Sequence, residues 1–169
     1  AFSGSVNLIG STFTNCKTDE DSSIKLTGED NSNSQISNCQ FIDCIANKYS
    51  VIISKGNFNL DSLSFTFSSS TNACSGLEIN SPKELSIIDC VFENNNNKDQ
   101  GSLFIHSDSG STHVISIRDI SFISCIGNNF KAINIDLKDI QSSSDELNIE
   151  NLIVRNIPSS STYIYQIKS

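Results

Sequence analysis

The chain is organised in short runs in which apolar residues alternate with small polar residues. In the clearest run, residues 85–106, apolar residues stand at alternate positions, a stretch from Asn94 to Asn97 interrupts them, and the alternation resumes at Leu103. A period of two residues is typical of β-strands with one buried face. The run therefore predicts a strand, a bend, a second strand, a loop and a third strand.

The same run recurs along the whole chain. With Phe92 as its anchor, the other copies fall into register at Phe13, Phe41, Phe65, Phe122 and Val154, at intervals of 28, 24, 27, 30 and 32 residues. The columns seven and five residues before the anchor are apolar in every copy except at Ser34. Their members are Val6, Ser34, Phe58, Leu85, Ile115 and Leu147, and then Leu8, Ile36, Leu60, Ile87, Ile117 and Ile149. A further column, two before the anchor, holds Ser11, Cys39, Leu63, Cys90, Ile120 and Leu152.

Two more apolar columns follow the anchor and predict the third strand. The first, 9 to 12 residues after the anchor, holds Ile24, Val51, Leu77, Leu103, Ile133 and Tyr163. The second, two residues further on, holds Leu26, Ile53, Ile79, Ile105, Ile135 and Tyr165. Since all of these columns point inward, we expect Leu60, Leu63, Ile87, Cys90, Ile117 and Ile120 to share one core.

A polar column three residues before the anchor marks a bend. It holds Gly10, Asn38, Ser62, Asp89, Asp119 and Asn151. These residue types tolerate a left-handed backbone or bond their own main chain. The bend therefore separates the first strand of each copy from the second.

Self-similarity of this kind predicts a solenoid, because no single copy can bury its inner residues without stacked neighbours. We expect an all-β parallel β-helix of about six coils, with three short strands each, in a single domain over residues 1–169. The pattern runs from Val6 to Tyr165 without a polar cap. We therefore expect a segment of a longer protein, or a unit that stacks on copies of itself.

Because its coil length varies, the chain resembles the right-handed parallel β-helix of the pectin-lyase-like proteins. Left-handed β-helices, by contrast, are built from regular hexapeptides. A looser resemblance is to the repeats of polymorphic outer-membrane proteins, which carry F-x-x-N and G-G-A-[ILV]. Residues 92–95 fit the first motif, and residues 75–77 and 101–103 keep part of the second. After Phe13, Phe41 and Phe122 a cysteine replaces the asparagine. These resemblances imply a fold that hosts polysaccharide lyases and hydrolases, phage tailspikes and surface adhesins.

Charge narrows the choice of partners. The net charge is −8 and the isoelectric point about 4.5, which disfavours nucleic acid and anionic membranes as partners. No apolar run approaches the ~18 residues of a membrane span. We interpret the excess carboxylates as surface residues that keep the protein soluble.

The resemblance to pectin-lyase-like enzymes implies chemistry on an outer sheet face, with clustered carboxylates or a cationic base. The only charged constellation on a strand face is formed by Asp89, Arg118, Asp119 and Glu150. It is the candidate catalytic site if the protein is an enzyme. The simpler interpretation is a surface ion pair between Arg118 and Glu150, which stand one coil apart.

Cysteines fall in two columns, with Cys16, Cys44 and Cys125 three after the anchor and Cys39 and Cys90 two before it. Only Cys16 and Cys44 stand in neighbouring coils, close to the usual Cα separation of a disulfide. They either form a disulfide or, like the other thiols, serve as small buried apolar groups.

No metal or cofactor is expected. The spacing of the cysteines matches no zinc motif, and the carboxylates of residues 18–21 and 28–30 match no calcium loop. His106 and His113 bracket a turn that contains Asp108, and we interpret them as turn residues rather than ligands.

Apolar residues at outward positions favour an interaction module over an enzyme. They include Ile42, Ile52, Ile88, Val91, Phe104, Ile123, Ile153 and Ile164. Ile88, Val91 and Phe104 are the candidate patch covered by a partner. We expect a non-catalytic structural or adhesive β-helix, extracellular or at a cell surface, that stacks on other coils, copies of itself, surface proteins or glycans. The alternative is a polysaccharide-acting lyase or hydrolase.

Overall fold

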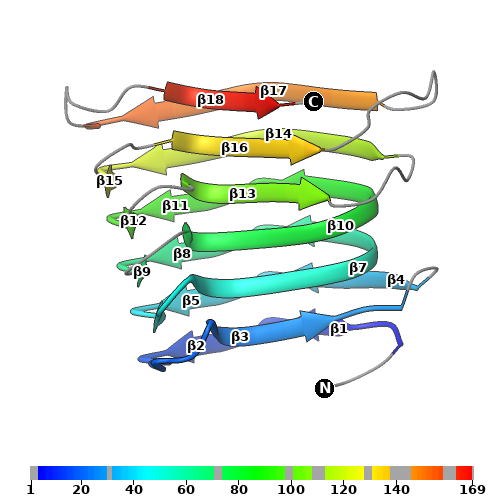
Figure 1. Cartoon of the computed structure of the whole chain (residues 1–169), viewed down its shortest axis with the longest axis horizontal. Helices are drawn as coiled ribbons and strands as arrows, with labels where there is room; N and C mark the ends of the chain where they lie inside the picture. Colours follow the sequence, from blue (N-terminus) through cyan, green and yellow to red (C-terminus); the bar gives the residue numbers. More distant parts are fainter. Residues whose placement is uncertain are drawn as a thin grey trace.

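The structure is a computed structural model that describes residues 4–29, 32–70, 74–97, 101–107, 113–127, 131–137, 146–157 and 163–168. Every regular element in these ranges is a β-strand, and the strands pair in parallel. Successive turns lie above one another, with β1 to β3 at one end of the stack and β17 and β18 at the other (Figure 1). The predicted all-β parallel solenoid is confirmed.

Four ladders run along the stack. The first ladder joins β1 (Asn7–Ile9), β4 (Asn33–Ser37), β7 (Tyr49–Asp61), β10 (Cys74–Ile88), β14 (Val114–Ile123) and β17 (Glu146–Arg155). The second ladder joins β2 (Thr12–Thr14), β5 (Gln40–Ile42), β8 (Ser64–Thr66) and β11 (Val91–Glu93) to the far halves of β14 and β17. The third, short ladder joins β6 (Ile45–Ala46), β9 (Ser69–Ser70), β12 (Asn96–Asn97) and β15 (Ile126–Gly127). The fourth ladder joins β3 (Ser22–Thr27), β7, β10, β13 (Gly101–Ser107), β16 (Lys131–Leu137) and β18 (Tyr163–Lys168).

The solenoid differs in two details from the one predicted from the sequence. The short third ladder was not expected, because two residues are too few to show an alternating pattern. The solenoid has about four turns rather than six coils. Among the described residues, the rung of β1, β2 and β3 and the rung of β17 and β18 are each stacked on one side only.

The predicted register is confirmed through the anchor column. Phe13 pairs with Phe41, Phe41 with Phe65, Phe65 with Phe92, Phe92 with Phe122, and Phe122 with Val154. One assignment is wrong: Ile133 pairs with Tyr165 and not with Tyr163, which pairs with Lys131. A slip of two residues keeps every side chain on the same face, so alternation alone cannot detect it.

Left-handed residues form the corners of each turn. All members of the predicted bend column have positive φ, from 52° at Asn151 to 61° at Gly10. A second left-handed column, which the sequence analysis missed, lies two residues after the anchor: Asn15, Asp43, Phe67, Asn94, Ser124 and Asn156. Asparagine, aspartate and serine suit this backbone, and Phe67 is its exception.

The inward columns form one continuous core. The six residues expected to share it are buried together: Leu60, Leu63, Ile87, Cys90, Ile117 and Ile120. The anchor phenylalanines stack face to face from Phe13 to Phe122, with ring centroids 4.8 to 5.2 Å apart. Ser34, the polar exception in its column, is buried and accepts a hydrogen bond from the Val6 N–H at 3.0 Å. That bond satisfies the hydroxyl inside the apolar column.

Candidate functional site

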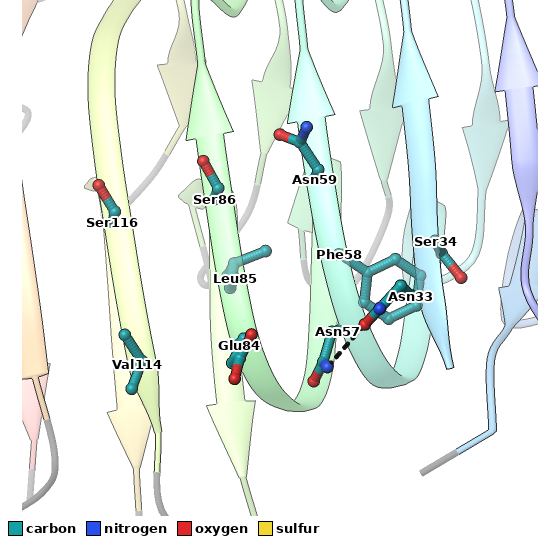
Figure 2. Close-up of a pocket in the computed structure, with 10 residues that line it drawn as sticks. All are labelled: Asn33, Ser34, Asn57, Phe58, Asn59, Glu84, Leu85, Ser86, Val114 and Ser116. Carbon is teal, nitrogen blue, oxygen red and sulfur yellow. Dashed lines mark hydrogen bonds between the residues drawn. The ribbon is translucent and has the colours of Figure 1, made fainter. Parts of the chain in front are cut away.

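A groove of about 410 Å³ lies along the first ladder. Its lining residues are Asn33, Ser34, Asn57, Phe58, Asn59, Glu84, Leu85, Ser86, Val114 and Ser116. Figure 2 shows two rows across the strands, Asn59, Ser86 and Ser116 in one and Asn57, Glu84 and Val114 in the other. Because neighbouring parallel strands are about 4.8 Å apart, amide and hydroxyl groups repeat along the groove at that interval.

A β-bulge lies beside the groove. Between Pro82 and Leu85, β10 contains one residue more than the matching part of β7, from Gly56 to Phe58. A bulge bends its strand and re-aims the neighbouring side chains. Glu84 lies in this bulge and is exposed. The sequence columns gave no signal of the groove, because the columns run from Leu85 onward and the extra residue precedes them.

Asn57 is the most constrained polar group of the groove. Its Nδ2 donates to Asn33 Oδ1 at 2.9 Å on the neighbouring strand, as drawn in Figure 2. Its own Oδ1 is buried and has no hydrogen-bond partner in the structure. An unpaired buried acceptor costs about 1–3 kcal/mol. A ligand hydroxyl or N–H that reached Asn57 Oδ1 would remove that cost.

The predicted charged constellation is assembled only in part. Arg118 and Glu150 are registered neighbours, as expected. However, the ion pair of Arg118 is with Asp119, Nε to Oδ2 at 3.3 Å, and Glu150 accepts a hydrogen bond from Asn148 at 3.0 Å. In the described part of the chain no Arg118–Glu150 ion pair forms. Both side chains of the Arg118–Asp119 pair are about half exposed, so the pair adds little stability.

The remaining members of the constellation lie at left-handed corners. Asp89 and Asp119 both have positive φ. Asp119 Oδ1 accepts a hydrogen bond from Asn151 at 2.9 Å, and Asp89 lies 3.5 Å from the Ser62 hydroxyl. These contacts link one corner to the next along the stack. They give Asp89 and Asp119 a structural role at the corners.

The three residues of the candidate apolar patch lie in three different ladders. Ile88 ends β10 in the first ladder and Val91 begins β11 in the second, on either side of the Asp89 corner, and both are half-buried. Phe104 lies on β13 in the fourth ladder, on another face of the turn, and is buried. The structure therefore places Ile88 and Val91 on either side of one corner and Phe104 on a different ladder.

Phe104 belongs instead to a buried polar cluster that the sequence analysis missed. Glu78 is 2% exposed although it occupies an outward position, and its Oε1 lies 2.7 Å from His106 Nε2. The His106 ring stacks on Phe104 with centroids 4.7 Å apart. The second carboxylate oxygen of Glu78, Oε2, is buried without a partner. Glu78 stands between the core residues Leu77 and Ile79, so the alternation assigned it to the outer face and gave no signal of its burial.

The two histidines have separate partners. His113 Nδ1 lies 2.6 Å from the Pro82 carbonyl oxygen, whereas His106 contacts Glu78. Asp108 lies outside the described residues. The described residues contain no group of three or more histidine, cysteine, aspartate or glutamate side chains that could hold a metal ion. In the carboxylate segment 18–21, Asp21 pairs with Lys48 at 3.0 Å. In the segment 28–30, Asp30 is outside the described residues.

Five cysteines are free thiols in the structure: Cys16, Cys39, Cys44, Cys90 and Cys125. All except Cys16 are buried. Burial raises the pKa of Cys90 to about 12, and it also raises the pKa of Cys125. Buried thiols in this state are poor nucleophiles.

The two ends of the stack expose residues that are buried in every interior turn. In the column of Leu8, the interior residues from Ile36 to Ile117 are at most 1% exposed. Leu8 and Ile149, at the two ends of the same column, are only partly buried. Leu147 is 37% exposed. Among the described residues, both end rungs therefore combine partly exposed core side chains with a strand edge that is paired on one side only.

Comparison of the chain with protein-family models, with curated proteins and with solved structures gave no match. None of the described residues belongs to a helix that is long and apolar enough to cross a membrane.

Proposed function

We propose that this protein is a non-catalytic structural or adhesive β-solenoid, of the right-handed pectin-lyase-like type, whose end rungs stack on further β-structure. The observation that carries the proposal is the partial exposure of Leu8 and Ile149 in a column that is otherwise fully buried. Each apolar side chain buried by stacking contributes roughly 1.5–3 kcal/mol. Display at a cell surface or outside the cell belongs to the same proposal.

The two end rungs are complementary in register. If the repeat continued from one copy to the next, Leu8 would lie on Ile149, Phe13 on Val154 and Cys16 on Ile157, so apolar residues would meet apolar residues. The left-handed corners would also coincide, Gly10 on Asn151 and Asn15 on Asn156. Such a contact joins two different surfaces and does not close, so it generates a filament.

Sedimentation velocity over a range of concentrations tests this proposal. Leu8→Lys blocks one end, Ile149→Lys blocks the other, and circular dichroism verifies that both variants fold. We expect the unmodified chain to form a ladder of oligomers and each variant to remain a monomer. A mixture of the two variants should give dimers and nothing larger, because each variant keeps one intact end.

A monomer at all concentrations in the unmodified chain, with both end rungs intact, contradicts stacking between copies. Oligomers that persist in the Leu8→Lys and Ile149→Lys variants place the association elsewhere on the surface. A control variant, Asn59→Lys in the groove, should assemble like the unmodified chain.

The groove supports a second candidate function, the binding of a polysaccharide. Its amide and hydroxyl groups repeat along the stack, and Asn57 Oδ1 is a free acceptor. Glu84 is the only carboxylate among the lining residues, whereas hydrolysis by acid and base requires two. The groove therefore favours binding over cleavage. Titration with neutral oligosaccharides tests it: Asn57→Ala should weaken binding at least tenfold and Asp119→Ala should not.

A further inference from the structure

Cys16 and Cys44 lie opposite each other on the first two rungs. The Ile45 N–H donates to the Cys16 carbonyl and the Asn15 N–H to the Ile42 carbonyl, each at 2.9 Å. These bonds fix the register on both sides of the pair. Neighbouring parallel strands are about 4.8 Å apart, which falls within the Cα separation of about 4.4–6.8 Å that a disulfide requires.

The Cys44 thiol is directed toward the first rung. Its Sγ lies 3.8 Å from the Phe13 carbonyl oxygen, an acceptor on that rung. Burial, and after it the nearby Cys16 thiol, raise the pKa of Cys44 to about 12. The effect of Cys16 on this pKa agrees with the close approach of the two side chains.

The other described cysteines lack such a neighbour. Cys39 has Ser11 and Leu63 in its column on the adjacent rungs. Cys90 lies between Leu63 and Ile120, and Cys125 lies between Asn95 and Ile157. Within the part of the chain that the structure describes, Cys16 and Cys44 are the only two cysteines that occupy the same column on successive rungs.

We infer that Cys16 and Cys44 form an intramolecular disulfide by exchange with a low-molecular-weight disulfide such as oxidised glutathione. Cys16 is the entry point because it lies on an end rung and is only partly buried. Its thiolate attacks one sulfur of the small disulfide, forms a mixed disulfide and releases one small thiol. When the end rung opens locally, the Cys44 thiol reaches solvent, loses its proton and attacks Cys16 Sγ, releasing the second small thiol. Two protein thiols are oxidised and one small disulfide is reduced.

The disulfide would fasten the first rung to the second. That rung is stacked on one side only among the described residues, so it opens more easily than the interior rungs. The link closes a loop from residue 16 to residue 44 and restricts the unfolded chain. This inference does not depend on the proposed function, since the pair lies inside the coil.

The test is incubation of the folded chain with a mixture of reduced and oxidised glutathione, followed by alkylation after denaturation and by mass spectrometry. We expect two fewer alkylated thiols than in the fully reduced protein. Cleavage after lysine should yield residues 1–17 joined to residues 26–48, and that species should disappear on reduction. Hydrogen exchange of the β2 amides should slow at least tenfold in the oxidised form.

Matched variants assign the bond. Cys39→Ser, which removes the other cysteine of the 26–48 peptide, should still lose two thiols. Cys16→Ser and Cys44→Ala should lose none, and both are conservative enough to be tested for folding by circular dichroism. A peptide joined through Cys39, or a lasting glutathione adduct on Cys16, would overturn the inference.

Discussion

Phe65 and Phe92 lie on successive rungs with ring centroids 4.8 Å apart and ring planes 5° from parallel. Both rings are fully buried, and both belong to the stack that runs from Phe13 to Phe122. This stack follows directly from the repeat, because paired residues in parallel strands place identical side chains above one another. It therefore contributes to the stability of several turns at once.

Phe92→Ala should destabilise the protein by about 3–5 kcal/mol, because it opens a cavity in the middle of the stack. Urea denaturation followed by circular dichroism measures the change. Phe67→Ala is the matched control, since Phe67 is 57% exposed and stacks on no other ring among the described residues. Equal losses in the two variants would mean that the stack does not contribute to stability.

Phe67→Asn should stabilise the protein by roughly 0.5–1 kcal/mol. Phe67 has φ of 54°, and a bulky residue is strained in the left-handed region where asparagine is tolerated. The reverse change at the equivalent corner, Asn94→Phe, should destabilise it. A shift of the unfolding midpoint in the same direction for both variants would contradict this account of the corners.

Gly76→Ala should lower stability by more than about 2 kcal/mol, because overpacking of this kind is costly. A Cβ at Gly76 would clash with the Ser102 carbonyl oxygen and would lie 2.8 Å from the Phe92 ring. Gly10→Ala is the control, because it meets no atom within 4 Å but has φ of 61°. We expect a smaller loss there, of about 1 kcal/mol.

His106→Ala should lower the free energy of unfolding more than Glu78→Gln does. His106→Ala leaves the buried Glu78 carboxylate without a partner, which costs roughly 3–5 kcal/mol in comparable pairs. In the double variant Glu78→Gln with His106→Ala, part of this loss should be recovered. Strict additivity of the single variants in a double-mutant cycle would show that the two side chains are not coupled.

Stability should fall at alkaline pH partly because of Cys90. Burial raises the pKa of its thiol from 9.0 to about 12. The unfolded chain therefore loses this proton near pH 9 while the folded chain keeps it, so the contribution is complete below pH 9 and is lost toward pH 12. The slope is about 1.4 kcal/mol per pH unit for one group.

Urea denaturation between pH 8 and 11 measures this dependence. Cys90→Ala should flatten the curve, whereas Leu63→Ala, at the same column position one rung away, should lower stability without changing the slope. An unchanged slope in Cys90→Ala would exclude this thiol as a source of the pH dependence.

Most of the fold could be predicted from the sequence because each inward position recurs in every copy. The register of Phe92 with its neighbours and the bend at Asp89 were both read from aligned columns. Tyr163 was misplaced since a shift by two residues leaves the alternation intact. The second corner column was missed because Phe67 conceals a position that otherwise favours asparagine, aspartate or serine.

The candidate sites were less predictable. Arg118 was expected to pair with Glu150 on the next rung, but Asp119 is nearer along its own strand. The groove lies beside the bulge before Leu85, and the alternating pattern of the sequence gives no signal of a single extra residue. The ion pair and the groove both depend on how neighbouring turns of the solenoid are placed relative to each other, and the local sequence pattern does not specify that placement.

The sequence by itself determined the solenoid, the identity of the core and the first corner, because the repetition of inward apolar residues leaves one way to bury them. Only the tertiary structure decided which outward residues become buried. Glu78 and Phe104 occupy outward positions by alternation, yet both are buried, and Glu78 contacts a histidine 28 residues away. Burial on an outer face depends on what packs over it in three dimensions, and no period along the chain encodes that.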